Sequence, residues 1–484
     1  MKKNLAQLMA VLVFFTSLVQ SGARAESSEN RGIALKFVQT TIPKKLNNLN
    51  IGVTELVSLA SDGTQGNGNS DAGNVSADGR YAVFGSDSSN LVPRDTNNFC
   101  DANEDGIYID NCPDVFVHDR WTGQTTRVSV ASDGRQGNRA SLGGYISADG
   151  RFVAFDSDAS NLVNNDTNHS LDVFVYDRST GQTTRVSISS DGTEGDFPSR
   201  SVTMSADGRY VTFGSYASNL VSDDTNGQSD VFVHDRQTGQ TTRISVASDG
   251  TQGNAWADIP SISADGRYVA FQSESSNLVS DDTNGLTDVF IHDQQTGQTT
   301  RISLASDGTH GNEDAAVPSI SADGRYVAFA SMSSNLVIND SNGFWDIFVH
   351  DQQTNQTIRV SVNSDGTQGN NDSGFTGIPS ISADGRFVAF HSEASNMVDD
   401  DTNGRGDVFV HDRQTGQTIR VSVASDGSEQ NRYCYGRFIS SDGRFITFES
   451  NANNLVINDR NRKVDAFVRD VGIVGTLFLP FVVR

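Results

Sequence analysis

The sequence has few cysteines, few basic residues and no long apolar run. Its three cysteines are too few to staple a disulfide scaffold. The 36 Lys and Arg stand against 60 Asp and Glu and give a formal charge of −24, so the chain lacks the basic surface that nucleic-acid binding requires. No apolar run reaches the roughly 18 residues of a membrane-spanning helix, and we expect no membrane span. Heptads and Gly-X-Y periods are also missing, which excludes coiled coil and collagen.

The first 25 residues are typical of a secretory signal peptide. Lys2 and Lys3 precede an apolar run over residues 5–19, and an Ala-Arg-Ala cleavage site ends at Ala25. We therefore expect an exported protein, located in the periplasm, outside the cell or at the cell surface. The alternative, in which this segment is a buried first helix, is left open by the pattern alone.

A unit of about 58 residues recurs seven times along the chain. Each copy is rich in β-branched residues, glycine and asparagine, and none shows the apolar period of about 3.6 residues that helical repeats need. The units therefore predict stacked or radial β-repeats. Each contains an Asp-Gly-Arg turn, and these turns begin at Asp78, Asp149, Asp207, Asp265, Asp323, Asp384 and Asp442.

The unit over residues 259–304 predicts four strands. The first is short and small-sided, which suits a crowded axis, and the third is apolar on both sides, as expected for a sheet between neighbours. The fourth alternates apolar and polar residues, so that one face meets water. Small side chains near the axis, a fully buried middle strand and a half-exposed outer strand are typical of a propeller blade. The expected strands cover residues 259–263, 268–271, 289–292 and 300–304.

The two ends of the repeat region predict a closed ring. The seventh unit stops after its third strand at residues 466–468, whereas an isolated fourth-strand sequence lies at residues 55–57. Pairing the two removes an exposed sheet edge. We predict an all-β fold, a seven-bladed β-propeller of four-stranded antiparallel blades closed by an N-terminal strand. The expected segments are a signal peptide (1–25), an N-terminal linker (26–50), the propeller (51–470) and an apolar C-terminal tail (471–484).

The repeat also resembles a known family. Residues 263–271 read Ser-Ala-Asp-Gly-Arg-Tyr-Val-Ala-Phe, residues 288–293 read Asp-Val-Phe-Ile-His-Asp, and Thr296-Gly297 follows. This pattern resembles the WD-like β-propeller repeat of TolB-type proteins, over roughly residues 51–470. The resemblance implies a secreted or periplasmic propeller that binds proteins or small ligands. It specifies the fold and leaves the ligand open.

The loops between the second and third strands carry a second repeated pattern. In a propeller these loops share one face with the connections between blades, whereas the Asp-Gly-Arg turns lie on the other. An Asp-x-Asn-Gly sequence followed by Asp brings hard oxygen atoms together around a tight turn, as calcium requires. The alternative, that Asp and Asn only satisfy the turn backbone, stays open. The candidate calcium ligands are Asp224, Asn226, Asp230, Asp282, Asn284 and Asp288.

The first unit contains an insertion at about residues 99–111. Asp101, Asn103 and Asp105 match the first half of an EF-hand-like calcium loop. The acidic residue that normally closes such a loop is absent. We predict calcium as a cofactor here too, with plain turn structure as the alternative.

The cysteines bracket the same insertion. Cys100 and Cys112 would form a disulfide in the oxidising compartment that an exported protein meets. Cys434 is expected on the same face and could instead pair with either of them, so three pairings remain open.

Residues that differ between the units are better guides to a specific ligand than those that repeat. The residue after the second-strand Phe varies, and Gln272 and His391 occupy this position in two units. Aromatic residues also gather in the loops of the fourth to sixth units, where they could bind a sugar or peptide. Packing of loop against loop is the alternative. The candidate ligand residues in these loops are Trp256, His310, Phe344, Trp345 and Phe375.

The sequence favours binding over catalysis. It has no Gly-x-Ser-x-Gly elbow, no His-Glu-x-x-His sequence and no phosphate-binding glycine loop. We therefore predict a secreted binding or scaffold propeller whose partner is a protein, peptide or carbohydrate. The alternative is a carbohydrate-active hydrolase or lyase that uses carboxylates of the loop face.

Overall fold

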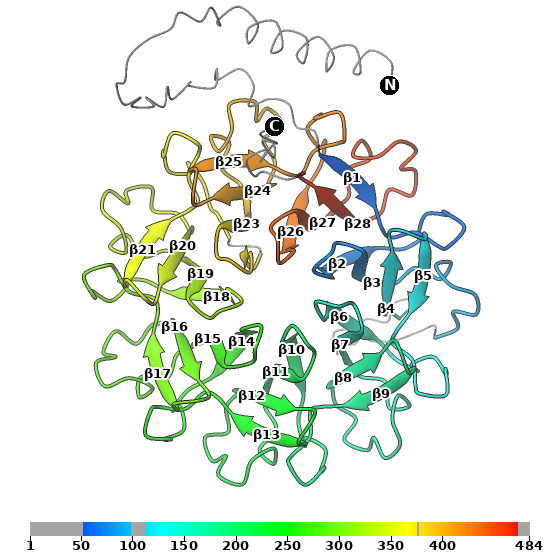
Figure 1. Cartoon of the computed structure of the whole chain (residues 1–484), viewed down its shortest axis with the longest axis horizontal. Helices are drawn as coiled ribbons and strands as arrows, with labels where there is room; N and C mark the ends of the chain where they lie inside the picture. Colours follow the sequence, from blue (N-terminus) through cyan, green and yellow to red (C-terminus); the bar gives the residue numbers. More distant parts are fainter. Residues whose placement is uncertain (1–51, 98–111, 375–376, 473–484) are drawn as a thin grey trace, which may run out of the picture. The chain divides into compact units, whose positions relative to one another are not determined.

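The computed structural model describes residues 52–97, 112–374 and 377–472. Within these ranges the chain forms 28 β-strands and no helix, and hence no helix that could cross a membrane. The strands build seven antiparallel sheets of four strands each, arranged as blades around a common axis (Figure 1). The predicted all-β, seven-bladed propeller is therefore confirmed.

In blades one to six the chain passes from an inner strand beside the axis to an outer strand at the rim (Figure 1). Blades one to three comprise β2 (Ser70–Val75), β3 (Tyr81–Ser86), β4 (Asp114–Asp119), β5 (Gln124–Arg127); β6 (Ser141–Ile146), β7 (Phe152–Ser157), β8 (Asp172–Asp177), β9 (Gln182–Arg185); and β10 (Ser199–Met204), β11 (Tyr210–Ser215), β12 (Asp230–Asp235), β13 (Gln240–Arg243). Blades four to six comprise β14 (Ala257–Ile262), β15 (Tyr268–Ser273), β16 (Asp288–Asp293), β17 (Gln298–Arg301); β18 (Ala315–Ile320), β19 (Tyr326–Ser331), β20 (Asp346–Asp351), β21 (Gln356–Arg359); and β22 (Ser380–Ile381), β23 (Phe387–Ser392), β24 (Asp407–Asp412), β25 (Gln417–Arg420).

Blade seven closes the ring with strands from both ends of the described chain. It combines β26 (Cys434–Ile439), β27 (Phe445–Ser450) and β28 (Asp465–Asp470) with β1 (Val53–Leu56), which pairs antiparallel with β28. The fully buried guanidinium of Arg469 donates to the Thr54 hydroxyl at 2.9 Å and so ties the two strands together. The N-terminal strand predicted near residues 55–57 is confirmed.

All four strands of the unit analysed above differ from their predicted bounds by one to three residues, and two of the differences have a visible cause. The inner strand β14 begins two residues earlier, and a bulge with Ile259 at a φ of 52° interrupts its register with β15. The outer strand β17 ends at Arg301 instead of residue 304. Beyond this point the Ser303 hydroxyl, and not a backbone carbonyl, accepts the Val289 N–H at 3.2 Å.

The core lies between neighbouring blades. In blade four Phe271 and Phe290 are fully buried, and their ring centroids lie 5.9 Å apart. The same aromatic pair recurs in all seven blades. The second and third strands are thus buried on both faces, which confirms the prediction made for the third strand.

The Asp-Gly-Arg turns define the turn face, opposite the loop face. Arg267 binds Asp293 of its own blade through two hydrogen bonds of 2.9 and 2.7 Å, which holds the pKa of Asp293 well below its usual range. Because each guanidinium is paired in this way, these arginines give the turn face little free positive charge. The pairs are Arg80–Asp119, Arg151–Asp177, Arg209–Asp235, Arg267–Asp293, Arg325–Asp351, Arg386–Asp412 and Arg444–Asp470.

Backbone hydrogen bonds also join the blades close to the axis. The Ala77 N–H donates to the Ala148 carbonyl at 3.0 Å, and equivalent bonds continue from blade to blade as far as Ser441. We call this series the axial hydrogen-bond chain. It requires close approach of neighbouring backbones, which the small side chains of these alanines and Ser441 permit.

Candidate functional site

The acidic loops predicted from the sequence lie between the second and third strand of each blade, and we call them rim loops. In blade three Asp224 and Asn226 lie in the rim loop, and Asp230 is the first residue of β12. The Asn226 side chain accepts the Gln228 N–H at 2.8 Å and donates to Asp230 at 3.3 Å. The asparagine therefore closes the loop on itself, in agreement with the turn-chemistry alternative.

A glutamine and an arginine lie against the two aspartates of this rim loop. Gln252 donates to Asp224 at 2.8 Å and to Asp230 at 3.1 Å. Arg243 Nη1 lies 3.8 and 3.9 Å from the same two carboxylates. These groups place positive charge and hydrogen-bond donors against both carboxylates. Calcium binding by Asp224, Asn226 and Asp230 stays a prediction.

Blade four repeats the arrangement with a histidine in place of the glutamine. Arg301 lies 3.1 Å from the carboxylate of Asp288, and His310 Nε2 bonds Asp281 at 3.0 Å. The predicted ligand residue His310 thus belongs to the charge network of a rim loop. Calcium binding in this blade also stays a prediction, for the ligands Asp282, Asn284 and Asp288.

In each blade one residue after the outer strand lies beside the rim loop of the same blade. We call its position the rim slot. It is set by an isolated β-bridge within the connection to the next blade, such as that between Val246 and Gln252. Most blades have an amide here, and two have a glutamate. The rim-slot residues are Gln65, Gln136, Glu194, Gln252, His310, Gln368 and Glu429.

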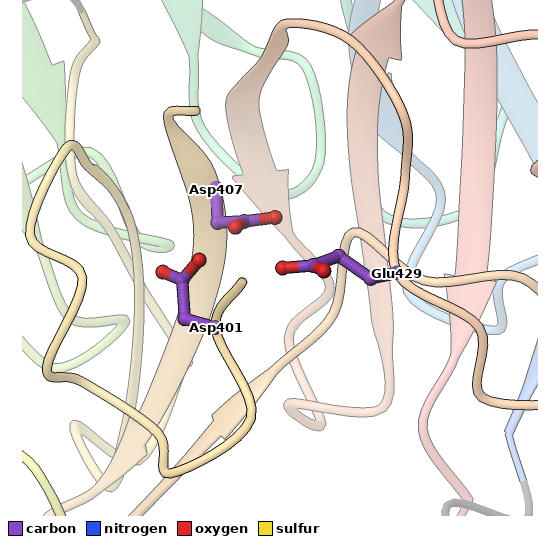
Figure 2. Close-up of side chains that lie close together, drawn as sticks. All are labelled: Asp401, Asp407 and Glu429. Atoms are coloured by element: carbon purple, nitrogen blue, oxygen red, sulfur yellow. The ribbon is translucent and has the colours of Figure 1, made fainter. Parts of the chain in front are cut away.

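In blade six the rim slot completes a cluster of three carboxylates. Figure 2 shows Asp401 of the rim loop, Asp407 at the start of β24 and Glu429 facing one another. In the described part of the chain, these residues form the group whose carboxylate oxygens all lie within 4.8 Å of one another, close enough to hold a metal ion. Burial raises the pKa of Asp407 to about 7 and that of Asp401 to about 6.

The inner strands surround a central cavity of about 450 Å³. This volume falls within the roughly 300–1,000 Å³ that is usual for small-molecule sites. The alanines of the axial hydrogen-bond chain line its end at the turn face. The wall is mostly apolar or small, with Asp71 and Asp156 among its few charged residues.

Polar side chains at the end of the second strands bind the inner-strand bulge of the next blade. Ser201, at a φ of 60°, donates its N–H to Asp156 at 3.2 Å. Val317, at a φ of 50°, donates its N–H to the Gln272 side chain at 2.8 Å. Glu449 accepts an N–H of blade one in a similar way. These contacts secure backbone that is strained for residues other than glycine.

Asp156 differs from its counterparts because one of its oxygens has no hydrogen-bond partner. Oδ2 accepts the Ser201 N–H, whereas Oδ1 is buried and unbonded among the described residues. Burial, reinforced by the nearby charge of Asp258, raises the pKa of Asp156 to about 7, and Arg200 acts in the opposite sense. The cavity wall therefore presents an unsatisfied acceptor.

Exposed aromatic side chains lie in blade three, whose inner strand lines the cavity beside Asp156. Phe197 is 55% exposed and Tyr216 is 43% exposed, and the Arg200 guanidinium lies 5.7 Å from the Tyr216 ring. We did not predict these residues or Asp156 as site residues from the sequence. Aligning the units would have drawn attention to Tyr216, because the equivalent residue of blade four is the polar Glu274.

The aromatic ligand residues that we did predict lie in separate connections of the loop face. Trp256 precedes β14 and is half-buried, as are Phe344 and Trp345 in the rim loop of blade five. Trp345 packs against the core shared by blades five and six, which favours the loop-packing alternative. His391 is buried on β23, and burial lowers its pKa to about 4. Ligand binding by these residues, and by Gln272, stays a prediction.

Several predicted site residues lie outside the described residues, namely Cys100, Asp101, Asn103, Asp105 and Phe375. Cys112 is disulfide-bonded, and Cys434 is a buried free cysteine. The two alternative pairings with Cys434 are therefore wrong. The bridge to Cys100 and the calcium loop of the insertion stay predictions.

Comparison with known proteins identifies the fold. No protein-family model matches the sequence, and no curated protein matches it. An oligogalacturonate lyase in complex with manganese is 14% identical, with a TM-score of 0.50 over 87% of this chain and 96% of the lyase. TolB from Acinetobacter baumannii is 16% identical, with a TM-score of 0.39 over 64% of this chain and 59% of TolB.

Another similar structure is a protease propeller from Pyrococcus furiosus, which is 9% identical with a TM-score of 0.46 over 79% of this chain and 91% of the other. That propeller is described as having an open velcro topology, whereas β1 closes the ring here. TolB-type chains are among the similar structures, as the repeat predicts. At these identities the likeness shows the propeller fold alone.

Proposed function

We propose that this protein is an exported binding propeller. Its ligand would carry a cationic or hydrogen-bond-donating group and bind at the mouth of the central cavity on the loop face. The observation that carries this proposal is the buried, unbonded Oδ1 of Asp156 in the cavity wall. A buried acceptor without a partner costs free energy, and a ligand that supplies a donor removes that cost.

The surroundings of Asp156 make this side of the mouth unlike the rest of the ring. Arg200 lies 3.3 Å from the Asp258 carboxylate and stacks toward Tyr216. Phe197 adds an exposed apolar surface in the same blade. Aromatic anchors beside oriented polar groups are typical of peptide and sugar sites. We therefore place the site in blades two to four, where basic peptides and amino sugars are the best candidates.

Export and calcium belong to the same proposal. A disulfide at Cys112 fits an oxidising compartment, as does the signal-like sequence over residues 1–25. Calcium would bind on the loop face where carboxylates outnumber their donors. In blade three Arg243 and Gln252 already lie against the two aspartates, so we expect weaker calcium binding there.

The test is a binding screen of the chain against an array of basic peptides and neutral or amino oligosaccharides. For any ligand found, Asp156→Asn and Tyr216→Ala should each weaken binding by about tenfold or more, because each removes a central contact. Met332→Ala is the control, since Met332 is also exposed, at 40%, but lies in blade five. It should leave the affinity unchanged.

Two outcomes would count against this function. Unchanged affinity in both Asp156→Asn and Tyr216→Ala would reject the mouth of the cavity as the site. Cleavage of an oligosaccharide in the array would favour the alternative of a carbohydrate-active hydrolase or lyase.

A further inference from the structure

The residue in the rim slot differs in its chemistry from blade to blade. In three blades Gln65, Gln136 and Gln252 each donate an amide N–H to an aspartate of the rim loop and to the aspartate that begins the third strand. In blade six Glu429 places a carboxylate at the same position. Glutamine and glutamate have nearly the same shape, so the difference replaces a donor with a third acceptor where the carboxylates converge.

A single guanidinium meets these three carboxylates. Arg420 Nη1 lies 2.6 Å from Glu429, 3.5 Å from Asp407 and 3.7 Å from Asp401. The Asp401 side chain is only 1% exposed, and its Oδ1 has no hydrogen-bond partner among the described residues. A separation of 3.7 Å is an ion-pair distance but too long for a hydrogen bond. A buried acceptor is therefore left facing the centre of the cluster (Figure 2).

The charge of the cluster matches a divalent cation. Three carboxylates against one guanidinium leave an excess of two negative charges when all are ionised. Holding such an excess in a buried place is costly unless a cation or bound protons compensate it. The converging ligand atoms are all carboxylate oxygens, which hard cations prefer over softer transition metals.

We propose that Asp401, Asp407 and Glu429 bind a hard divalent cation, with Ca²⁺ as the expected ion. Calcium accepts several carboxylates in flexible geometry, whereas magnesium usually keeps its water and takes one or two. Arg420 remains anchored to Asp400, because its Nη2 donates to the Asp400 carbonyl at 3.1 Å and lies 3.3 Å from its carboxylate. This site goes beyond ligand binding at the cavity and does not depend on it.

Blade two supplies a matched comparison. Glu194 fills the rim slot there, beside Asp166 and Asp172. Arg185 Nη1 lies 2.7 Å from Glu194, 3.0 Å from Asp172 and 3.5 Å from Asp166. The guanidinium thus lies closer to both aspartates than in blade six and already fills the centre. We expect blade two not to bind calcium.

The experiment is isothermal titration of the EDTA-stripped full chain with CaCl₂. Relative to wild type, Glu429→Gln should lose one bound Ca²⁺ per chain or at least tenfold in affinity. Glu194→Gln, the same change in blade two, should behave like wild type. Calcium should also raise the melting temperature of wild type and Glu194→Gln more than that of Glu429→Gln, because an ion that binds the native state stabilises it.

Glu429→Gln recreates the rim slot of blade three, so we expect it to fold, and its melting temperature in EDTA checks this. If it is unstable there, Asp401→Asn should show the same loss of calcium binding. Equal stoichiometry and affinity in all the proteins would overturn the proposal, even if calcium binds elsewhere, as at the predicted insertion loop. A wild type that takes up no calcium would overturn it as well.

Discussion

At the scale of single residues, burial decides what the carboxylates of this acidic chain do. Asp293 is paired with Arg267, which holds its pKa well below the usual range. Asp156 faces the cavity wall, where burial raises its pKa to about 7. The two residues are chemically identical, and the sequence around them does not reveal the difference. Their neighbours come from other strands and other blades.

Asp156→Asn should change how stability depends on pH. The native pKa of about 7 exceeds the usual value of 3.8, so between these values the native state binds more protons than the unfolded chain. The contribution of Asp156 to stability therefore falls as pH rises through this window. Asparagine does not titrate. The free energy of unfolding of Asp156→Asn, relative to wild type, should rise by roughly 2–3 kcal/mol from pH 5 to pH 8. Urea titrations at both pH values measure this, and an equal difference at both would contradict it.

At the scale of strands, the sequence predicts the elements better than their irregularities. The alternating and apolar stretches place the strands of blade four to within a few residues. The bulges in the inner strands could not be foreseen, because Ile259 and Val317 are β-branched and disfavour a positive φ. Their conformation depends on contacts that local sequence does not contain, such as the bond from Val317 to Gln272.

Phe290→Ala should be strongly destabilising. Phe290 is fully buried and pairs with Phe271 between two blades, and removing such a side chain leaves a cavity that costs about 3–5 kcal/mol. Phe197→Ala is the matched control, because Phe197 is 55% exposed and should cost little. The midpoints of urea unfolding compare the two. Similar midpoints for both variants would show that the blades do not pack as described.

At the scale of the whole molecule, the repeat predicts the ring but not the site. The sequence has seven fourth strands and seven Asp-Gly-Arg turns, but the first of these strands precedes the first turn. This order is enough to predict that β1 closes the ring. The sequence predicts calcium sites in the rim loops, because their carboxylates and asparagines have the spacing of calcium ligands. Their donors, Arg243 and Gln252 in blade three, come from further along the chain. Only the folded chain shows which rim loop lacks a sufficient donor.

Deleting residues 51–60 should destabilise the entire propeller. The deletion removes β1, exposes the edge of β28 and leaves the buried Arg469 without Thr54. Losing the pairing of β1 with β28 opens the ring and costs several kcal/mol, so we expect the melting temperature to fall by roughly 3–6 °C. A chain that begins at residue 50 and keeps β1 is the control. Equal melting temperatures for the two chains would refute the role of β1 in closure.

The pairing of β1 with β28 also means that the ring can close only after the last blade has been synthesised. Thr54 and Arg469 are 415 residues apart in the chain, so β1 leaves the ribosome first but has no partner until the last blade has been made. At synthesis rates of about 5–20 residues per second, that interval is roughly 20–80 s. Throughout it β1 is an unpaired strand, open to pairing with the wrong edge or with another chain. We therefore expect aggregation of this protein to depend on how well its earliest strand is shielded until the last blade has been made.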